Sequence, residues 1–172
     1  MAVVKAVKPL PMLCLDIEIA VARFFGYRDN LIVPNITWGL GFTHELDVLV
    51  MSRAGYVTEV EIKTSAQDLK RDLLKRHGHR STRIRNHYLA VPENLVELGL
   101  ATFPPHWGVL KVNFRENGGG CWSVRMPKTN KEAKPLMAKE ITHLYELASM
   151  RVWTLKETLA QRINRSRLRQ EK

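Results

Sequence analysis

The sequence has little of what extracellular, membrane-embedded or disulfide-stabilised proteins need. Only two of its 172 residues are cysteines, and Cys14 and Cys121 are far apart and form no Cys-x-x-Cys pair, so no disulfide framework is expected. No apolar run approaches the length of a membrane-spanning helix. Residues 1–11 lack the long apolar stretch and small-residue cleavage site of a signal peptide. These absences predict a cytoplasmic protein that does not enter a membrane.

Two ligand-binding patterns are missing as well. The histidines in the first half of the chain fit no usual zinc spacing and have no cysteine near them, namely His44, His77, His79 and His87. The glycine run 118–120 precedes an expected strand rather than a helix, so it predicts a turn and not a loop that cradles phosphate. Neither zinc binding nor a glycine-rich phosphate loop is therefore expected.

Positive charge is abundant. The chain has 27 Lys and Arg against 17 Asp and Glu, a formal net charge of +10 and a pI near 9.9. The excess is gathered in residues 63–85 and 162–172. Clustered cations are typical of a surface that neutralises phosphates, although charge alone would also suit solubility or a membrane surface. The residues expected to contact nucleic acid are Lys70, Arg71, Lys75, Arg76, Arg162, Arg165, Arg167 and Arg169.

The hydrophobic pattern predicts an α/β core over residues 1–126, followed by a linker and a basic helical extension over 127–172. A helix over 11–25 carries Cys14 in its apolar pattern, so this cysteine is expected in the core. Strands are expected at 30–35, 44–51, 56–63, 88–91, 109–114 and 121–126, with helices at 64–77 and 93–100. This order suits a central mixed sheet flanked by helices.

The extension keeps a helical period from Met137 to Ile163. One helix of that length exceeds what a small domain needs. It is expected either to break near residues 150–153 or to project toward a partner, which includes the other subunit of a homodimer.

The strand 56–63 carries the residues with the clearest chemistry. Residues two apart on a strand share a face, so Glu59, Glu61 and Lys63 point one way. A hairpin turning at 52–55 would bring Asp47 beside Glu61. Neighbouring carboxylates repel unless a cation lies between them, and oxygen ligands suit magnesium or manganese. The expected metal ligands are Asp47, Glu61 and the carbonyl of Ile62. The alternative is an amphipathic edge strand whose charges face water and form cross-strand ion pairs.

These residues resemble the PD-(D/E)XK nuclease superfamily. Asp47, followed after a hairpin by Glu61-Ile62-Lys63, is similar to its signature, with Leu46 at the position of the proline. The later order, a polar helix over 65–68 and then the stretch 87–95 (HYLAVPENL), resembles the MmcB-like DNA-repair endonucleases of bacteria and phages. The resemblance covers roughly residues 13–112.

The resemblance implies a restriction-endonuclease-like core and a magnesium- or manganese-dependent DNA endonuclease, acting in repair, recombination or phage DNA processing. It implies catalytic roles for Asp47, Glu61 and Lys63. Glu18 matches a glutamate that the superfamily often places near the metal, and Gln67 lies where some relatives carry an active-site glutamine. Each is also explained by an ordinary polar helix position. Two other functions stay open: a non-catalytic nucleic-acid-binding module on the same fold, and an interaction protein that uses its C-terminal helix.

Overall fold

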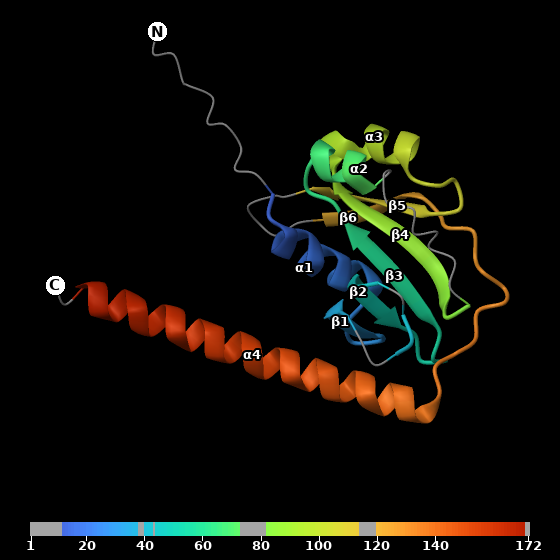
Figure 1. Ribbon diagram of the computed structural model, residues 1–172. Coiled ribbons are helices and arrows are strands. Elements are labelled where there is room, and N and C mark those ends of the chain that lie inside the picture. Colours follow the sequence, from blue (N-terminus) through green and yellow to red (C-terminus); the bar gives the residue numbers. More distant parts are fainter. Residues whose placement is uncertain (1–11, 38–39, 43, 73–81, 114–119, 171–172) are drawn as a thin grey trace, which may run out of the picture.

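The computed structural model describes residues 12–37, 40–42, 44–72, 82–113 and 120–170, in which helices cover both faces of a six-stranded sheet (Figure 1). The first helix, α1, spans Cys14–Phe25. The side chain of Asp16 accepts a hydrogen bond of 2.9 Å from the backbone N–H of Leu13 and so caps its start. Gly26 ends the helix with a φ of 72°, in the left-handed region that favours glycine.

The sheet is mixed, as the sequence predicts. Its strands follow chain order: β1 (Leu31–Ile36), β2 (Leu46–Met51), β3 (Val57–Ile62), β4 (Ile84–Pro92), β5 (Gly108–Asn113) and β6 (Gly120–Arg125). The pairs β1–β2, β2–β3 and β5–β6 are antiparallel, whereas β3–β4 and β4–β5 are parallel. Parallel neighbours need a crossover connection, and α2 (Ala66–Asp72) and α3 (Val96–Thr102, preceded by the 3-10 turn Glu93–Leu95) lie in these two connections.

One face of the sheet is covered by α1. Ile17 and Val21 of the helix are fully buried in an apolar cluster with side chains from β2, β3, β4 and β5. The sheet residues of this cluster are Val48, Val50, Val60, Ile62, Tyr88, Ala90, Leu110 and Val112. Because side chains alternate along a strand, burial of Val60 and Ile62 here directs Glu59 and Glu61 to the opposite face.

Two separate apolar clusters occupy that opposite face. Leu144 of the last helix, α4 (Ala138–Gln170), packs in a cluster with Leu49, and Leu69 of α2 packs in another with Leu89. Figure 1 shows the two groups of helices at different ends of the sheet, α2 and α3 at one end and α4 at the other. Glu59 lies on the strand between these clusters, so a polar strip separates them.

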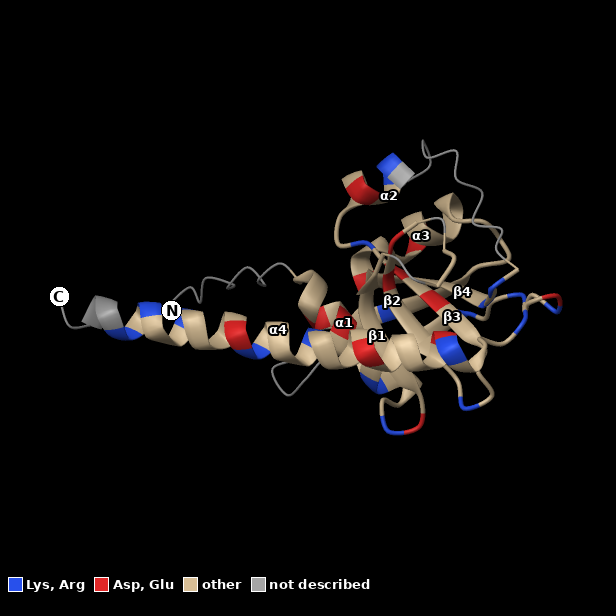
Figure 2. Ribbon diagram, turned by 60° about the horizontal axis from the view of Figure 1, so that its bottom comes forward, with Lys and Arg blue, Asp and Glu red and all other residues tan. Residues whose placement is uncertain are grey.

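The last helix, α4, runs without a break over Ala138–Gln170, so the expected break near residues 150–153 is wrong. Its N-terminal end is fixed by an ion pair of 2.7 Å between Arg83 and Glu140. Further along, Arg151 donates a hydrogen bond of 2.5 Å to the carbonyl of Asn35. Beyond this point the helix extends past the sheet (Figures 1 and 2).

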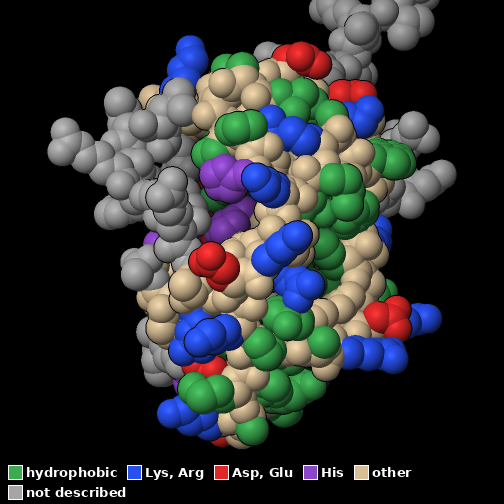
Figure 3. Space-filling model, turned by 90° about the vertical axis from the view of Figure 1, so that its right-hand side faces the viewer, with side chains coloured by type: hydrophobic (Ala, Val, Ile, Leu, Met, Phe, Trp, Pro, Cys, Tyr) green, Lys and Arg blue, Asp and Glu red, His purple; other side chains and the backbone are tan. Residues whose placement is uncertain are grey.

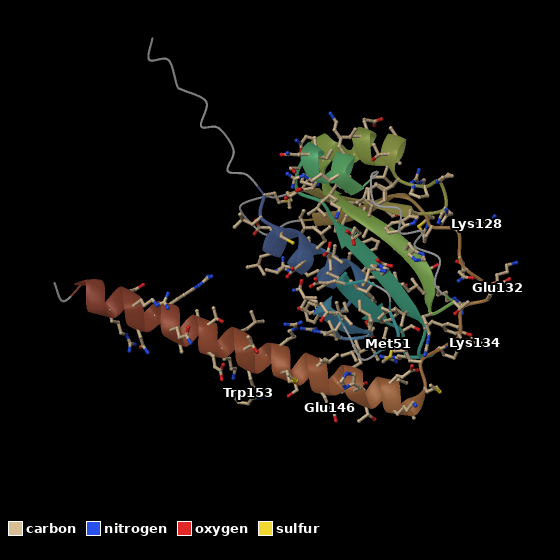
Figure 4. All side chains as sticks on the ribbon, viewed as in Figure 1. Met51, Lys128, Glu132, Lys134, Glu146 and Trp153 are labelled. Atoms are coloured by element: carbon tan, nitrogen blue, oxygen red, sulfur yellow. The ribbon has the colours of Figure 1, made fainter. Side chains whose placement is uncertain are left out.

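The segment between β6 and α4 is held to the core by its backbone. Asn130 N–H donates to the carbonyl of Arg85 at 2.8 Å, and Leu136 N–H donates to the carbonyl of Gly55 at 2.9 Å. Figure 4 shows the side chain of Met51 near the first turns of α4, and those of Glu146 and Trp153 on the side of α4 turned away from the sheet. The first half of α4 is therefore part of the compact unit.

Several expected boundaries differ from the observed ones. The strand expected at 88–91 spans Ile84–Pro92, because pairing with β3 extends it through polar residues that interrupt the apolar run. The helix expected over 64–77 begins at Ala66 and is described to Asp72. Among the helices of the described residues, none is long and apolar enough to cross a membrane.

Candidate active site

The β2–β3 hairpin brings two carboxylates to the same place in the sheet. Val48 pairs with Val60 in the antiparallel register, so the next residues, Asp47 and Glu61, lie opposite one another. Asp47 Oδ2 also accepts a hydrogen bond of 2.7 Å from the backbone N–H of Ile62. The structure agrees with the expectation that the hairpin brings Asp47 beside Glu61.

Asp47 lies where its negative charge is disfavoured. Burial, and then the negative charge of Glu61, raise its pKa from 3.8 to about 6, although the hydrogen bond from Ile62 and the charge of Lys63 act in the opposite direction. The ionised carboxylate therefore carries an electrostatic penalty in the protein without a ligand. A cation beside Asp47 and Glu61 would remove much of that penalty.

Glu61 and Lys63 lie in the interior of the sheet and not at its edge. β3 is between β2 and β4, and only 7% of Glu61 is exposed. Lys63 Nζ lies 2.5 Å from Glu61 Oε1. The backbone N–H of Lys63 donates a hydrogen bond of 3.1 Å to the carbonyl of Ala90, which continues the pairing with β4. An edge strand whose charges face water is thus excluded for these residues.

A cavity of about 390 Å³ opens beside these groups. It is lined by Cys14, Asp47, Ile62, Lys63, Thr64, Asp68 and Arg71. The wall residues come from the start of α1, the hairpin strands and the first turns of α2, so three separate parts of the chain converge there. Sequence reasoning found four of the lining residues and missed Cys14, Thr64 and Asp68. Thr64 and Asp68 follow the Glu-Ile-Lys motif within a few residues, and this proximity was the available signal.

The N-terminal turn of α1 belongs to the site, although Cys14 was expected in the core. Cys14 is exposed because the buried stripe of the helix begins one turn later, at Ile17. Its thiol lies 3.7 Å from Glu18 Oε1, and its pKa is raised to about 11 by partial burial and by the charges of Glu18 and Asp47. Burial, and more weakly the charge of Asp47, also raise the pKa of Glu18. Glu18 is therefore close enough to Asp47 for their charges to interact.

Helix α2 presents its side chains to the cavity unequally. Ser65 Oγ accepts a hydrogen bond of 3.2 Å from the backbone N–H of Asp68 and caps the helix. Asp68 and Arg71 line the cavity, whereas Gln67 and Lys70 are exposed and are not among the lining residues. Arg71 Nη1 is 3.9 Å from Asp68 Oδ1 with both side chains largely accessible, so this pair holds the guanidinium only weakly.

Within the described residues, the predicted DNA-contacting arginines of α4 lie away from the cavity. Arg162, Arg165 and Arg167 are exposed on α4, which packs at the other end of the sheet from α2 (Figure 1). Lys75, Arg76 and the side chain of Arg169 lie outside the described residues. On the face shown in Figure 3, Lys and Arg also predominate over Asp and Glu. Positive charge is thus spread over the described surface, and the cavity lining includes Lys63 and Arg71.

A buried histidine–carboxylate group adjoins the two carboxylates. Glu59 is completely buried, and its carboxylate lies 2.7 Å from His44 Nε2 and 3.5 Å from His87 Nε2. The hydrogen bond to Glu59 raises the pKa of His44, with smaller contributions in the same direction from Glu61 and Asp47. The sequence placed Glu59 on this face but gave no signal for the two imidazoles, since they come from other segments of the chain.

The carboxylates at and beside the cavity offer hard oxygen ligands. Within the residues whose side chains are described, no group of three or more His, Cys, Asp or Glu is arranged to hold a metal ion. A cation here would instead rest on two carboxylates, Asp47 and Glu61, with a backbone carbonyl and water completing the shell. Magnesium commonly binds proteins through one or two carboxylates and keeps several waters, so this donor set suits it.

Comparison with known proteins finds a solved structure of similar fold but gives no activity. No family model matches the sequence, and no curated protein matches it. Among solved structures, the chain is similar to SPO1766, a protein of unknown function from Silicibacter pomeroyi, with a TM-score of 0.59 and 19% sequence identity. The match covers 90% of this chain and 94% of that chain. At this identity the chain shares its fold with that protein, and the site must supply any argument about function.

Proposed function

We propose that this chain is a metal-dependent DNA endonuclease with a PD-(D/E)XK-type site. The observation that carries the proposal is the meeting of Asp47, Glu61 and Lys63 on two adjacent strands, beside a cavity that Arg71 also lines. Two facing carboxylates and a lysine, beside a cavity that Arg71 also lines, suit metal-dependent hydrolysis of a phosphodiester.

The order of elements supports a restriction-endonuclease-like core. The carboxylate strands β2 and β3 form an antiparallel hairpin after α1, and α2 then leads to the parallel strand β4. The motif residues lie where β3 ends and α2 begins, so the strands fix the carboxylates and the helix presents Arg71. Such rigid placement is what catalysis by positioned charges needs.

The residues present fit a magnesium or manganese ion. Asp47 and Glu61 would hold it, together with the carbonyl of Ile62, and Glu18 would bind one of its waters. The raised pKa of Asp47, caused by burial and by Glu61, is the feature that a bound cation would relieve. A metal held there would polarise a phosphate and lower the pKa of a coordinated water.

Lys63 is the residue proposed to stabilise negative charge on the phosphate. Its ammonium lies 2.5 Å from Glu61, so in the protein without substrate it neutralises one of the two carboxylates. With a phosphate in the cavity, the same ammonium stabilises negative charge that develops on the phosphoryl oxygens. Arg71 on α2 would hold a flanking phosphate, because its exposed guanidinium lines the cavity. Lys70, exposed on the same helix, stays a predicted phosphate contact.

DNA is the proposed substrate, in repair, recombination or phage DNA processing within the cytoplasm. The net charge of +10 supports a polyanionic ligand. Contacts of Arg162, Arg165 and Arg167 with DNA stay a prediction. Formation of a homodimer through α4 also stays a prediction. A nucleic-acid-binding module without catalysis would use the same basic surface, and the assay below distinguishes the two.

The test is incubation of the purified protein with labelled duplex, junction, flap and single-stranded DNA, in magnesium, in manganese and in EDTA. We expect cleavage of at least one structure that requires the metal and stops in EDTA. Tight binding of DNA with no cleavage in either metal would instead identify a binding module.

A further inference from the structure

The second half of α4 leaves the body of the protein with large apolar side chains exposed. Leu155 is 63% exposed and Leu159 is 58% exposed. In proteins most of a helix's stability comes from packing of its apolar face, and the apolar side chains of this half of α4 are exposed to solvent. This segment is unrelated to the Asp47 site, which lies at the start of α1 and α2.

The apolar residues of α4 follow the spacing of a coiled coil. Positions 141, 145, 148, 152, 155 and 159 alternate in steps of four and three, and they are occupied by Ile, Tyr, Ala, Val, Leu and Leu. Ile141 and Ala148 pack against the apolar cluster on the sheet, and the same side of the helix continues outward as Val152, Leu155 and Leu159. We call the last three residues the seam. Such a narrow stripe with a heptad period suits docking against another helix.

Basic residues flank the seam on both sides. With each residue turned about 100° from the last, Arg151 and Arg165 fall on one side of it and Lys156 and Arg167 on the other. The next step of three beyond Leu159 reaches Arg162, where the apolar seam ends. Glu157 falls on the opposite side of the helix. It is the only acidic residue between positions 147 and 167. A helix lying on the seam would thus meet positive charge along both of its edges.

We propose that the projecting half of α4 docks an amphipathic helix of a partner protein that carries apolar residues on its inner face and Asp or Glu at its edges. Interhelical charge pairs beside the seam set partner choice in coiled coils. A second copy of this chain matches the seam but would oppose like charges in either orientation, at Arg151, Lys156 and Arg165.

Other polyanions fit the same segment less well. Phosphates of nucleic acid would engage the arginines but would leave Leu155 and Leu159 in water. A helix that lies on a lipid surface presents a broad apolar face, whereas here Lys156 and Arg167 separate the seam from the exposed side chain of Trp153. The alternation of steps of four and three, together with charges of one sign, therefore favours an acidic helix.

The test uses the full chain and two synthetic four-heptad peptides with leucine at the a and d positions. One peptide has glutamate at every e and g position, and the other has lysine there. Fluorescence anisotropy should show binding of the glutamate peptide and none of the lysine peptide. Leu155→Gln should weaken that binding at least tenfold. Met150→Gln, at an exposed apolar position about 140° around the helix from Leu155, should leave it unchanged. Circular dichroism confirms that both variants stay folded.

Several results would overturn the proposal. Equal binding of the two peptides, or binding that Leu155→Gln leaves intact, would show that the seam is not the docking surface. Dimerisation of the chain by sedimentation equilibrium, lost in Leu155→Gln, would identify a second copy as the occupant. Binding to phosphatidylserine vesicles or duplex DNA that Leu155→Gln abolishes, with no binding of the glutamate peptide, would identify that other ligand.

Discussion

Replacing Asp47 by asparagine should stabilise the protein in the absence of metal, even though it removes a proposed catalytic group. Folding raises the pKa of this carboxyl from 3.8 to about 6, mainly through burial and the charge of Glu61. The folded state therefore binds the proton more tightly than the unfolded state, and stability falls as pH rises from about 4 to about 6. Above about pH 6 the destabilisation caused by the charge of Asp47 no longer changes with pH. The difference between the two pKa values corresponds to about 3 kcal/mol.

Asparagine has nearly the same size and keeps an oxygen that can accept the hydrogen bond from Ile62 N–H. We expect Asp47→Asn to recover about 1–3 kcal/mol of unfolding free energy near pH 8, and almost none below about pH 4. Urea unfolding in EDTA at both pH values measures this. Magnesium should then stabilise the wild type but not the variant, because only the wild type keeps both carboxylates.

The matched control is Asp29→Asn, the same chemical change at a side chain that is 72% exposed and paired with Arg53 on the surface. This pair contributes little, so the control should change stability by less than about 1 kcal/mol at either pH. If Asp47→Asn is less stable than the wild type near pH 8 in EDTA, or its effect does not depend on pH, the proposed electrostatic penalty at Asp47 is refuted.

Three further outcomes are expected. Glu59→Gln should lower the free energy of unfolding by about 1–3 kcal/mol, because it removes the buried charge that faces His44; urea unfolding at wild-type stability would contradict this. Arg83→Ala should destabilise the start of α4 by about 2 kcal/mol near pH 7. Burial acts to raise the pKa of Glu140, but its bonds to Arg83 lower that pKa overall. The stabilisation by this ion pair is therefore present above the ordinary pKa of a glutamate and is lost as pH falls through the lowered pKa of Glu140. A stability difference between Arg83→Ala and the wild type that persists in acid would be inconsistent with this. Lys63→Met should bind magnesium-free DNA more weakly than the wild type does, and anisotropy titrations at matched salt measure the change.

The strands and the carboxylate pair were predictable because they depend on short-range pattern. Alternation in the 56–63 segment put Glu59, Glu61 and Lys63 on one face, and the hairpin length put Asp47 opposite Glu61. These features need only the period of a strand and one turn. The mixed sheet followed from the order of helices and strands.

The rest of the site depends on contacts between distant segments. His44, Glu59 and His87 come from three separate segments of the chain and lie together in the fold. No local sequence pattern predicts that they are close. Cys14 was assigned to the core from its apolar neighbours, but it lies at the first turn of α1, before the buried stripe begins. The sequence could not decide whether α4 is continuous for a related reason. A helical period in the sequence does not show which half of the helix packs on the sheet.

The most direct test of the proposed active site is cleavage of supercoiled plasmid DNA in magnesium by wild-type protein and by Lys63→Met, purified in parallel. A contaminating nuclease would act equally in both preparations, so the comparison assigns any activity to the site. Lys128→Met, at an exposed lysine between β6 and α4, is the matched control for loss of one positive charge. We predict that the wild type and Lys128→Met cleave, and that folded Lys63→Met does not. Cleavage by Lys63→Met at the wild-type rate would contradict the assignment of Asp47, Glu61 and Lys63 as the catalytic centre.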